Sequence, residues 1–148
     1  MRAARAAIAD ALVAAVKGSS YPFNTVSKHF VSWDSQDTTS WPVAYVKHMA
    51  EEVKREMYGT SRYHVHYRIF CYALVNSADP NFDQEDQVIG PLLDALDAAF
   101  KPQIDGGKFD LSLRGVDEAF IEGQILIADG VEDGRAVVVV PVTVSVAG

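Results

Sequence analysis

The sequence predicts an α+β fold: one domain with a mixed, mostly antiparallel β-sheet and two main helices packed on one face. Two segments, residues 2–17 and 91–102, carry apolar residues at helical spacing. Most of the remaining chain consists of runs that alternate or are rich in β-branched residues. No internal repeat or low-complexity linker divides the 148 residues. We therefore expect residues 1–148 to form a single domain around one core.

The composition is that of a globular protein, with 49% hydrophobic and 22% charged residues. The longest strongly apolar run, residues 136–142, is far shorter than the roughly 20 residues that a membrane-spanning helix needs. Asp10 interrupts the apolar N-terminal segment, which favours a helix over an export signal. We expect neither insertion into a membrane nor export.

The net charge and the number of cysteines indicate which partners and which compartment suit the chain. The net charge is −7 and the 13 basic residues are scattered, which disfavours recognition of nucleic acid through its phosphates. Cys71 is the only cysteine, so no intrachain disulfide can form, as suits a protein made in a reducing cytosol. Its place between Ile69 and Ala73 on an apolar strand face predicts a buried, inert thiol.

Two helices are expected from their apolar stripes. The first covers residues 2–17 and stops at Gly18, and the second begins with Pro91 in its first turn and closes at Pro102. The stripe residues are Ile8, Leu12, Ala15 and Val16 in the first helix, and Leu92, Leu93, Leu96, Ala99 and Phe100 in the second.

The first half of the chain also predicts two extended segments and one segment whose type stays open. Residues 25–33 read as a strand that leads into a polar loop, and residues 43–47 are extended after Pro42. Residues 47–57 are charged, and residues 50–57 fit either a helical turn or a solvated edge strand.

Residues 63–75 form the clearest strand, because apolar side chains recur at every second position on one face. The opposite face is polar at His64, His66 and Arg68 and becomes apolar at Phe70 and Tyr72. We expect the helix at 91–102 to cover that second face near its C-terminal end.

The C-terminal part predicts an antiparallel meander of strands at residues 109–113, 119–128 and 135–146. Asp129 and Asp133 mark the turn between the last two strands. Pro141 lacks the N–H that a ladder uses, so we expect it at an edge or a bulge, where a partner is able to dock.

Two groups of residues suggest metal binding and then fall short. His64 and His66 lie about 7 Å apart along one strand face, but no third ligand is near in the sequence, so solvent-facing or interface histidines are the default interpretation. The acidic stretch 79–86 starts like a calcium loop, yet Gln84 and Gly90 stand where an EF-hand needs Gly and Glu. We expect no metal and no cofactor.

Catalytic motifs such as a nucleophile elbow or a phosphate-binding glycine loop are absent from the sequence. Trp33 and Trp41 flank the polar loop 34–40, where they serve either as interface anchors or as core residues at strand ends. The residues alone therefore indicate an α+β domain without catalytic equipment.

Several segments, in their order and spacing, resemble the tail-terminator or minor tail proteins of long-tailed, lambda-like bacteriophages. The resemblance extends over residues 26–146. Its segments are residues 42–46 (PVAYV), 67–73 (YRIFCYA), 91–102 (PLLDALDAAFKP) and 121–123 (IEG), the last leading into 138–142 (VVVPV). Residues 47–57 depart from the usual pattern by their charge.

The resemblance implies a structural protein of a phage or prophage, made in the bacterial cytoplasm and placed in the virion at the tail or neck. Such proteins form hexameric rings that end tail polymerisation and offer a surface for head joining, with the tail-tube protein and a head-completion protein as partners. No catalytic residue is implied. The candidate interface residues are Trp33, Trp41, Asp79, Asp83, Asp86, Asp129, Asp133 and Pro141.

Two alternatives stay open at this point. One is a head–tail connector or neck protein of similar fold. The other is a small α+β enzyme or ligand-binding domain with a pocket around His64, His66 and Arg68, which requires a deep cavity at those residues.

Overall fold

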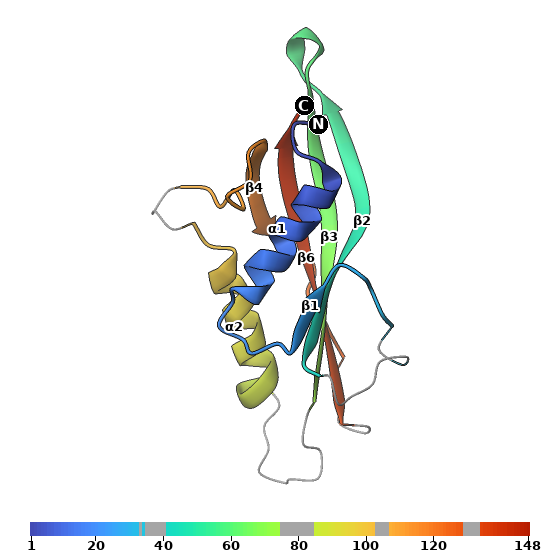
Figure 1. Cartoon of the computed structure of the whole chain (residues 1–148), viewed down its shortest axis with the longest axis vertical. Helices are drawn as coiled ribbons and strands as arrows, with labels where there is room; N and C mark the ends of the chain where they lie inside the picture. The colour runs from blue at the N-terminus through green and yellow to red at the C-terminus, as the bar shows by residue number, and fades with distance from the viewer. Residues whose placement is uncertain (33, 35–40, 75–84, 103–106, 129–133) are drawn as a thin grey trace.

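The computed structural model describes residues 1–32, 34, 41–74, 85–102, 107–128 and 134–148, and the side chains of residues 85 and 86 lie outside this part (Figure 1). Six strands form one mixed sheet in the order β1-β2-β3-β6-β4, and β5 also pairs with β6. Strands β1 and β2 run parallel, and all other neighbours are antiparallel. The predicted α+β fold is confirmed.

The elements follow the chain in a simple order. They are α1 (Arg5–Lys17), β1 (Thr25–Ser27), β2 (Val43–Arg55), the 3-10 turn η2 (Met57–Gly59), β3 (Ser61–Leu74), the π-helical turn η3 (Glu85–Ile89), α2 (Gly90–Ala99), β4 (Val116–Ile121), β5 (Leu126–Ala128) and β6 (Arg135–Ala147).

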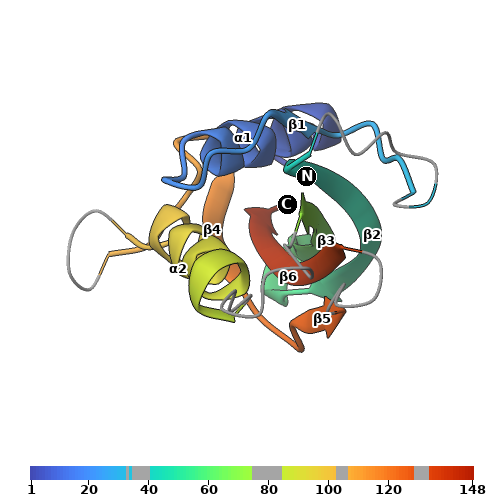
Figure 2. The ribbon, with the colours of Figure 1, turned by 90° about the horizontal axis from the view of Figure 1, so that it is seen from below.

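Both expected helices form where their apolar stripes begin and end. Ile8, Leu12 and Val16 of α1 are buried, and the N–H of Gly18 closes the helix on the carbonyl of Ala14 at 2.9 Å. In α2, Pro91 lies in the first turn, directly after the π-helical turn η3. The two helices flank the sheet on the same side (Figure 2).

The main core lies between these helices and one face of the sheet. Strands β3 and β6 pair from Arg62↔Ala147 to Leu74↔Arg135, and every second residue of each faces the helices. The buried residues of this core include Val65, Tyr67, Ile69 and Cys71 from β3, Val138, Val140, Val142 and Val144 from β6, and Leu92 and Leu96 from α2. Valine dominates β6 because a β-branched side chain packs well on a pleated surface.

The second face of the sheet carries an apolar cluster at one end, where the alternation in β3 predicts cover, but the cover is not α2. A separate cluster of Trp41, Val43, Tyr45 and Tyr72 buries that end, with Val31, Phe70 and Val137 packed against it. Helix α2 packs instead into the main core on the opposite face. The expectation about the helix was wrong because alternation shows that a face is buried without showing which segment buries it.

The ambiguous segment 50–57 is an edge strand up to Arg55. Strand β2 pairs with β3 along its whole length, with a bulge between His48 and Ala50, and with β1 only at Val43–Tyr45. No described strand pairs with the other edge of β2 after Tyr45. The charges of this segment fit an edge, because charged side chains discourage unwanted strand pairing.

Two strand predictions were too long and one was wrong. The strand at 25–33 is limited to β1, and the one at 119–128 splits into β4 and β5. Residues 109–113 form a turn, in which Leu111 and Ser112 have φ of 59° and 51° and the N–H of Ser112 donates to Oδ1 of Asp110. Alternation imitated a strand there because Leu111 is buried within the turn.

Pro141 does not lie at an edge of the sheet. Strand β6 has β3 on one side and β4 and β5 on the other, and Pro141 falls between the residues that pair with β4 and those that pair with β5. Its carbonyl accepts from the N–H of Glu122 at 3.2 Å. The N–H and C=O of a strand residue point to the same side, so the missing donor faces the gap between β4 and β5 and costs no bond to β3.

Candidate interaction surface

The far part of the β2–β3 hairpin extends beyond the rest of the molecule, past the point where the two chain ends meet the sheet (Figure 1, top). We call residues 47–68 the distal hairpin, from the cross-strand pair Lys47↔Arg68 to the turn, and residues 53–60 its tip. At the tip, Lys54↔Arg62 and Arg55↔Ser61 are the last pairs before the turn.

The tip is a tightly closed turn that exposes large apolar side chains. The N–H of Glu56 donates to the carbonyl of Thr60 at 2.8 Å, and Oγ1 of Thr60 donates to the carbonyl of Met57 at 3.1 Å. Tyr58 has φ 63° and ψ 29°, a left-handed conformation that is uncommon for a residue with a side chain. Exposed fractions reach 94% for Tyr58 and 75% for Met57.

The distal hairpin differs from the rest of the chain in charge. It contains five Lys or Arg and three Glu, a net charge of +2, within a chain of net charge −7. The remaining residues therefore carry −9. Lys54 and Arg55 belong to the tip itself, whereas Arg62 and Arg68 lie opposite β6 within the sheet.

A polar network fixes the base of the tip to the sheet. Arg62 donates to Oε1 of Glu56 at 2.8 Å and also to Asp117 of β4. These contacts hold the hairpin against β4, so the direction of the tip is set by the body rather than by the turn alone.

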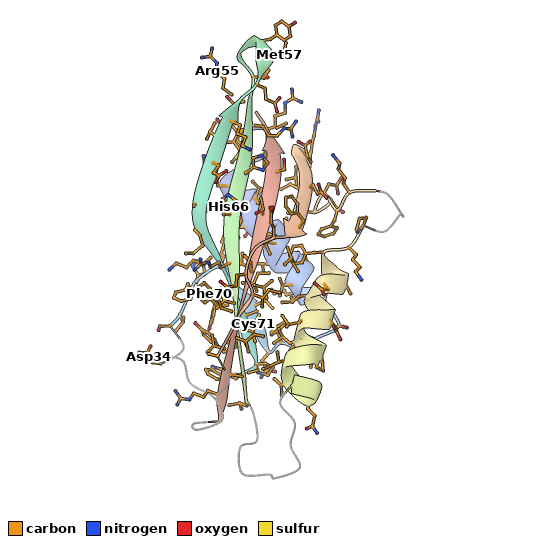
Figure 3. All side chains as sticks on the ribbon, turned by 180° about the vertical axis from the view of Figure 1, so that it is seen from behind. Asp34, Arg55, Met57, His66, Phe70 and Cys71 are labelled. Atoms are coloured by element: carbon orange, nitrogen blue, oxygen red, sulfur yellow. The ribbon has the colours of Figure 1, made fainter. Side chains whose placement is uncertain are left out.

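A second polar pair lies on the exposed sheet face. Nδ1 of His66 and Oγ1 of Thr143 are 3.1 Å apart, and Nε2 of His66 lies 3.9 Å from Glu52. Figure 3 shows His66 on the sheet face that lies away from the helices, between the tip and Phe70.

Two surface hollows lie in the described part of the chain. One, of about 520 Å³, is lined by residues 17 and 19–26 after α1, and the other, of about 540 Å³, lies where Arg2 meets residues 114–117 and Ala147. Neither of these two is lined by His64, His66 or Arg68. Within the described ranges, no group of three potential metal ligands comes together.

The structure describes only some of the interface residues that the sequence predicts. Trp33, Asp79, Asp83, Asp129 and Asp133 lie outside the described residues, and so does the side chain of Asp86. The sequence left open whether the tryptophans are interface anchors or core residues. Trp41 is a core residue, since it is 3% exposed and its ring centroid lies 5.4 Å from that of Tyr72.

Cys71 is fully buried, as the apolar strand face predicted. Burial raises the pKa of its thiol well above the ordinary value. A thiol held in this neutral form is a poor nucleophile.

Sequence reasoning missed the tip. The signal was present, because Gly59 separates two runs that both form strands, which is typical of a hairpin. Pattern reasoning does not show that Met57 and Tyr58 project into solvent beyond the rest of the molecule.

A scan against protein-family models found no match, and a search of curated proteins also found none. Across the described part of the chain, neither helix has the length and apolarity to span a membrane.

Proposed function

We propose that this chain is a non-enzymatic structural subunit that assembles with its own copies into a ring closing a bacteriophage tail tube. The observation that carries the proposal is the edge of β2 after Tyr45, with which no described strand pairs, together with the exposed tip. Val53 is 57% exposed and Met49 42% exposed on this strand, and Met57 and Tyr58 are exposed at the tip.

An unpaired edge and exposed apolar side chains favour association. A free strand edge offers a row of backbone donors and acceptors to another chain. When identical subunits join through two different patches, the contacts close into a ring if the rotation allows. Self-association buries these backbone groups and apolar side chains, which a monomer leaves exposed to solvent.

The phage assignment rests on the resemblance of the segments described above. The tail-tube protein and a head-completion protein are the expected partners, and the virion tail or neck is the expected location. The arrangement of one sheet with both described helices on one face is compatible with this assignment.

Light scattering coupled to size-exclusion chromatography tests self-association directly. We expect the purified chain, at several concentrations and with magnesium, to reach the mass of a hexamer of 16.2 kDa subunits. Electron microscopy of the same fractions should show closed rings. A monomer at every concentration would contradict the proposal.

Binding to purified tail tubes separates the tail terminator from the neck connector. A terminator binds the tube end in the absence of heads and stops further growth of the tube. A connector of similar fold binds the head side instead and leaves tube growth unchanged.

A further inference from the structure

We propose that two copies of the chain, while they are outside a ring, pair antiparallel through the free edges of their β2 strands, across a twofold axis at Val53. The paired stretch is residues 50–56 of each copy. It occupies the edge on which the proposed function rests, so a copy held in this pair has not joined a ring. A contact that uses the same patch on both subunits closes at two copies.

Residues 50–56 form a straight stretch of strand between two irregular points. The stretch begins after the bulge between His48 and Ala50 and ends where the turn Met57–Gly59 starts. One side of it pairs with β3, and no described strand pairs with the other side (Figure 1). Val53 is the central residue of this stretch and is 57% exposed.

The backbone groups of Val53 point to the free edge. The N–H of Glu56 donates to the carbonyl of Thr60, so the backbone groups of Glu56 point toward the β3 side of the hairpin. This direction alternates from residue to residue along an antiparallel strand. The N–H and C=O of Glu51, Val53 and Arg55 therefore point outward. Outward residues of one copy bond only to outward residues of the other, which requires a twofold axis at a residue rather than between two residues.

The charges of the stretch change sign at Val53. Two glutamates, Glu51 and Glu52, precede it, and two cations, Lys54 and Arg55, follow it. With the axis at Val53, Glu52 of each copy lies opposite Lys54 of the other. Glu51 likewise lies opposite Arg55. Opposite charges that face each other across two strands stabilise the pairing, and like charges destabilise it.

The same charges exclude the neighbouring registers. An axis at residue 52 would place Glu52 opposite its own copy, and an axis at residue 54 would do the same with Lys54. A slip in either direction is therefore unfavourable. Charges on a strand edge discourage partners that do not match them, and the charges of this edge match those of a second copy.

The two charge pairs differ in how free their members are. The side chain of Glu52 is 66% exposed and lies 3.9 Å from Nε2 of His66. Among the described residues, no acidic side chain forms an ion pair with Lys54. Glu51, on the other face, is 17% exposed and already bonded to Arg5. Substitutions at Glu52 and Lys54 therefore test the contact without disturbing α1.

Apolar side chains add to the contact. On the twofold axis, Val53 of one copy packs against Val53 of the other. Directly beyond each end of the paired stretch, Met49 of one copy comes near Met57 of the other. All three side chains are exposed in the single chain, and their burial between two copies favours association.

A cysteine on the twofold axis tests the register. The Cα atoms of a hydrogen-bonded antiparallel pair lie about 5.5 Å apart, a separation that a disulfide spans. We expect Val53→Cys to oxidise to a covalent dimer at least about tenfold faster than Leu126→Cys, a control at a strand residue that is 44% exposed. The native Cys71 is buried and does not contribute. The oxidised dimer should form rings only after reduction, and rings formed without reduction would overturn the proposal.

Charge reversals test the partner. E52K and K54E each place like charges opposite each other at both ends of the pair, so each should weaken dimer formation about tenfold in sedimentation at several concentrations. An equimolar mixture of the two should restore pairing, because contacts between the two variants join opposite charges. The double variant E52K/K54E has the net charge of the wild type and should pair as the wild type does.

Matched controls come from exposed charges elsewhere. E122K carries the same net charge as E52K, and K108E carries the same net charge as K54E. Both controls should leave dimer formation within about twofold of the wild type. Circular dichroism and thermal melts establish that every variant is folded.

The outcomes separate this pair from the proposed function. If the wild type forms rings while Val53→Cys cross-links no faster than Leu126→Cys, the pair is wrong and the proposed function stands. If Val53→Cys cross-links rapidly but the wild type stops at dimers at every concentration, the pair is right and the ring is wrong. Charge variants that all dimerise like the wild type would overturn the register.

Discussion

Arg5 and Glu51, which are 46 positions apart in the sequence, form two parallel hydrogen bonds of 2.7 Å that tie α1 to β2. Nε2 of His48 lies 3.0 Å from the same carboxylate. The hydrogen bond from Arg5 is the main cause that lowers the pKa of Glu51 below its ordinary value of 4.5. This pair anchors the helix at the foot of the distal hairpin.

Removal of this carboxylate should make stability less dependent on pH. A lowered pKa in the folded state contributes stability above the unfolded pKa, and that contribution is lost as the pH falls through the folded pKa. We expect Glu51→Gln to lower the Tm by at most about 3 °C at neutral pH, because the Arg5 side is exposed. The difference from the wild type should shrink as the pH drops below 4.5. Melts across that range check it, and a difference that grows at acid pH would contradict it.

Truncation of Leu92 should be among the most damaging changes in α2. Its side chain is 0% exposed and packs in the main core. Leu92→Ala should cost about 2–5 kcal/mol, because it removes buried contacts and leaves a cavity. Chemical denaturation measures the loss. Leu126→Ala is the control, since Leu126 is 44% exposed and should lose less than about 1 kcal/mol.

Gly115 should not tolerate even a methyl group. It has φ +95°, and a Cβ there would come within 2.8 Å of the carbonyl carbon of Arg2. The change also disturbs the strand end, where the N–H of Ala147 donates to Gly115. Gly59→Ala is a matched control, since its φ is +77° but nothing lies within 4 Å.

Comparison of the two glycine variants separates collision from backbone strain. Gly59→Ala should cost about 1 kcal/mol from conformation alone. Gly115→Ala should cost clearly more in the same denaturation experiment. Equal losses would show that the segment containing Arg2 moves away freely.

The thiol of Cys71 should be unreactive in the folded protein. It is buried and its pKa is raised by burial, so little thiolate forms at neutral pH. Labelling with a thiol reagent should follow global unfolding when denaturant is increased. Rapid labelling without denaturant would reveal an opening of the β3 region that the packing does not suggest.

Patterns that depend on near neighbours in the sequence were predictable here. The stripe that ends at Gly18 gave α1, and Pro91 marked the start of α2. The failures concern partners far apart in the sequence. Trp41 covers Tyr72, and Pro141 faces the gap between β4 and β5, because of how the sheet is ordered.

The candidate site was harder to predict for a related reason. Exposure of Met57 and Tyr58 depends on how far the hairpin extends past the pairing of β3 with β6. This property emerges only when the strands have a register.

The central position of β6 also has a kinetic consequence. This strand joins β3 to β4 and β5, yet the ribosome makes it after every other described element. Until it emerges, β3 lacks one neighbour and the helices lack the β6 side chains that they pack on. Contacts between residues so distant in sequence form slowly, so we expect folding in milliseconds to seconds. A nascent chain without β6 is thus the species most in need of protection by chaperones.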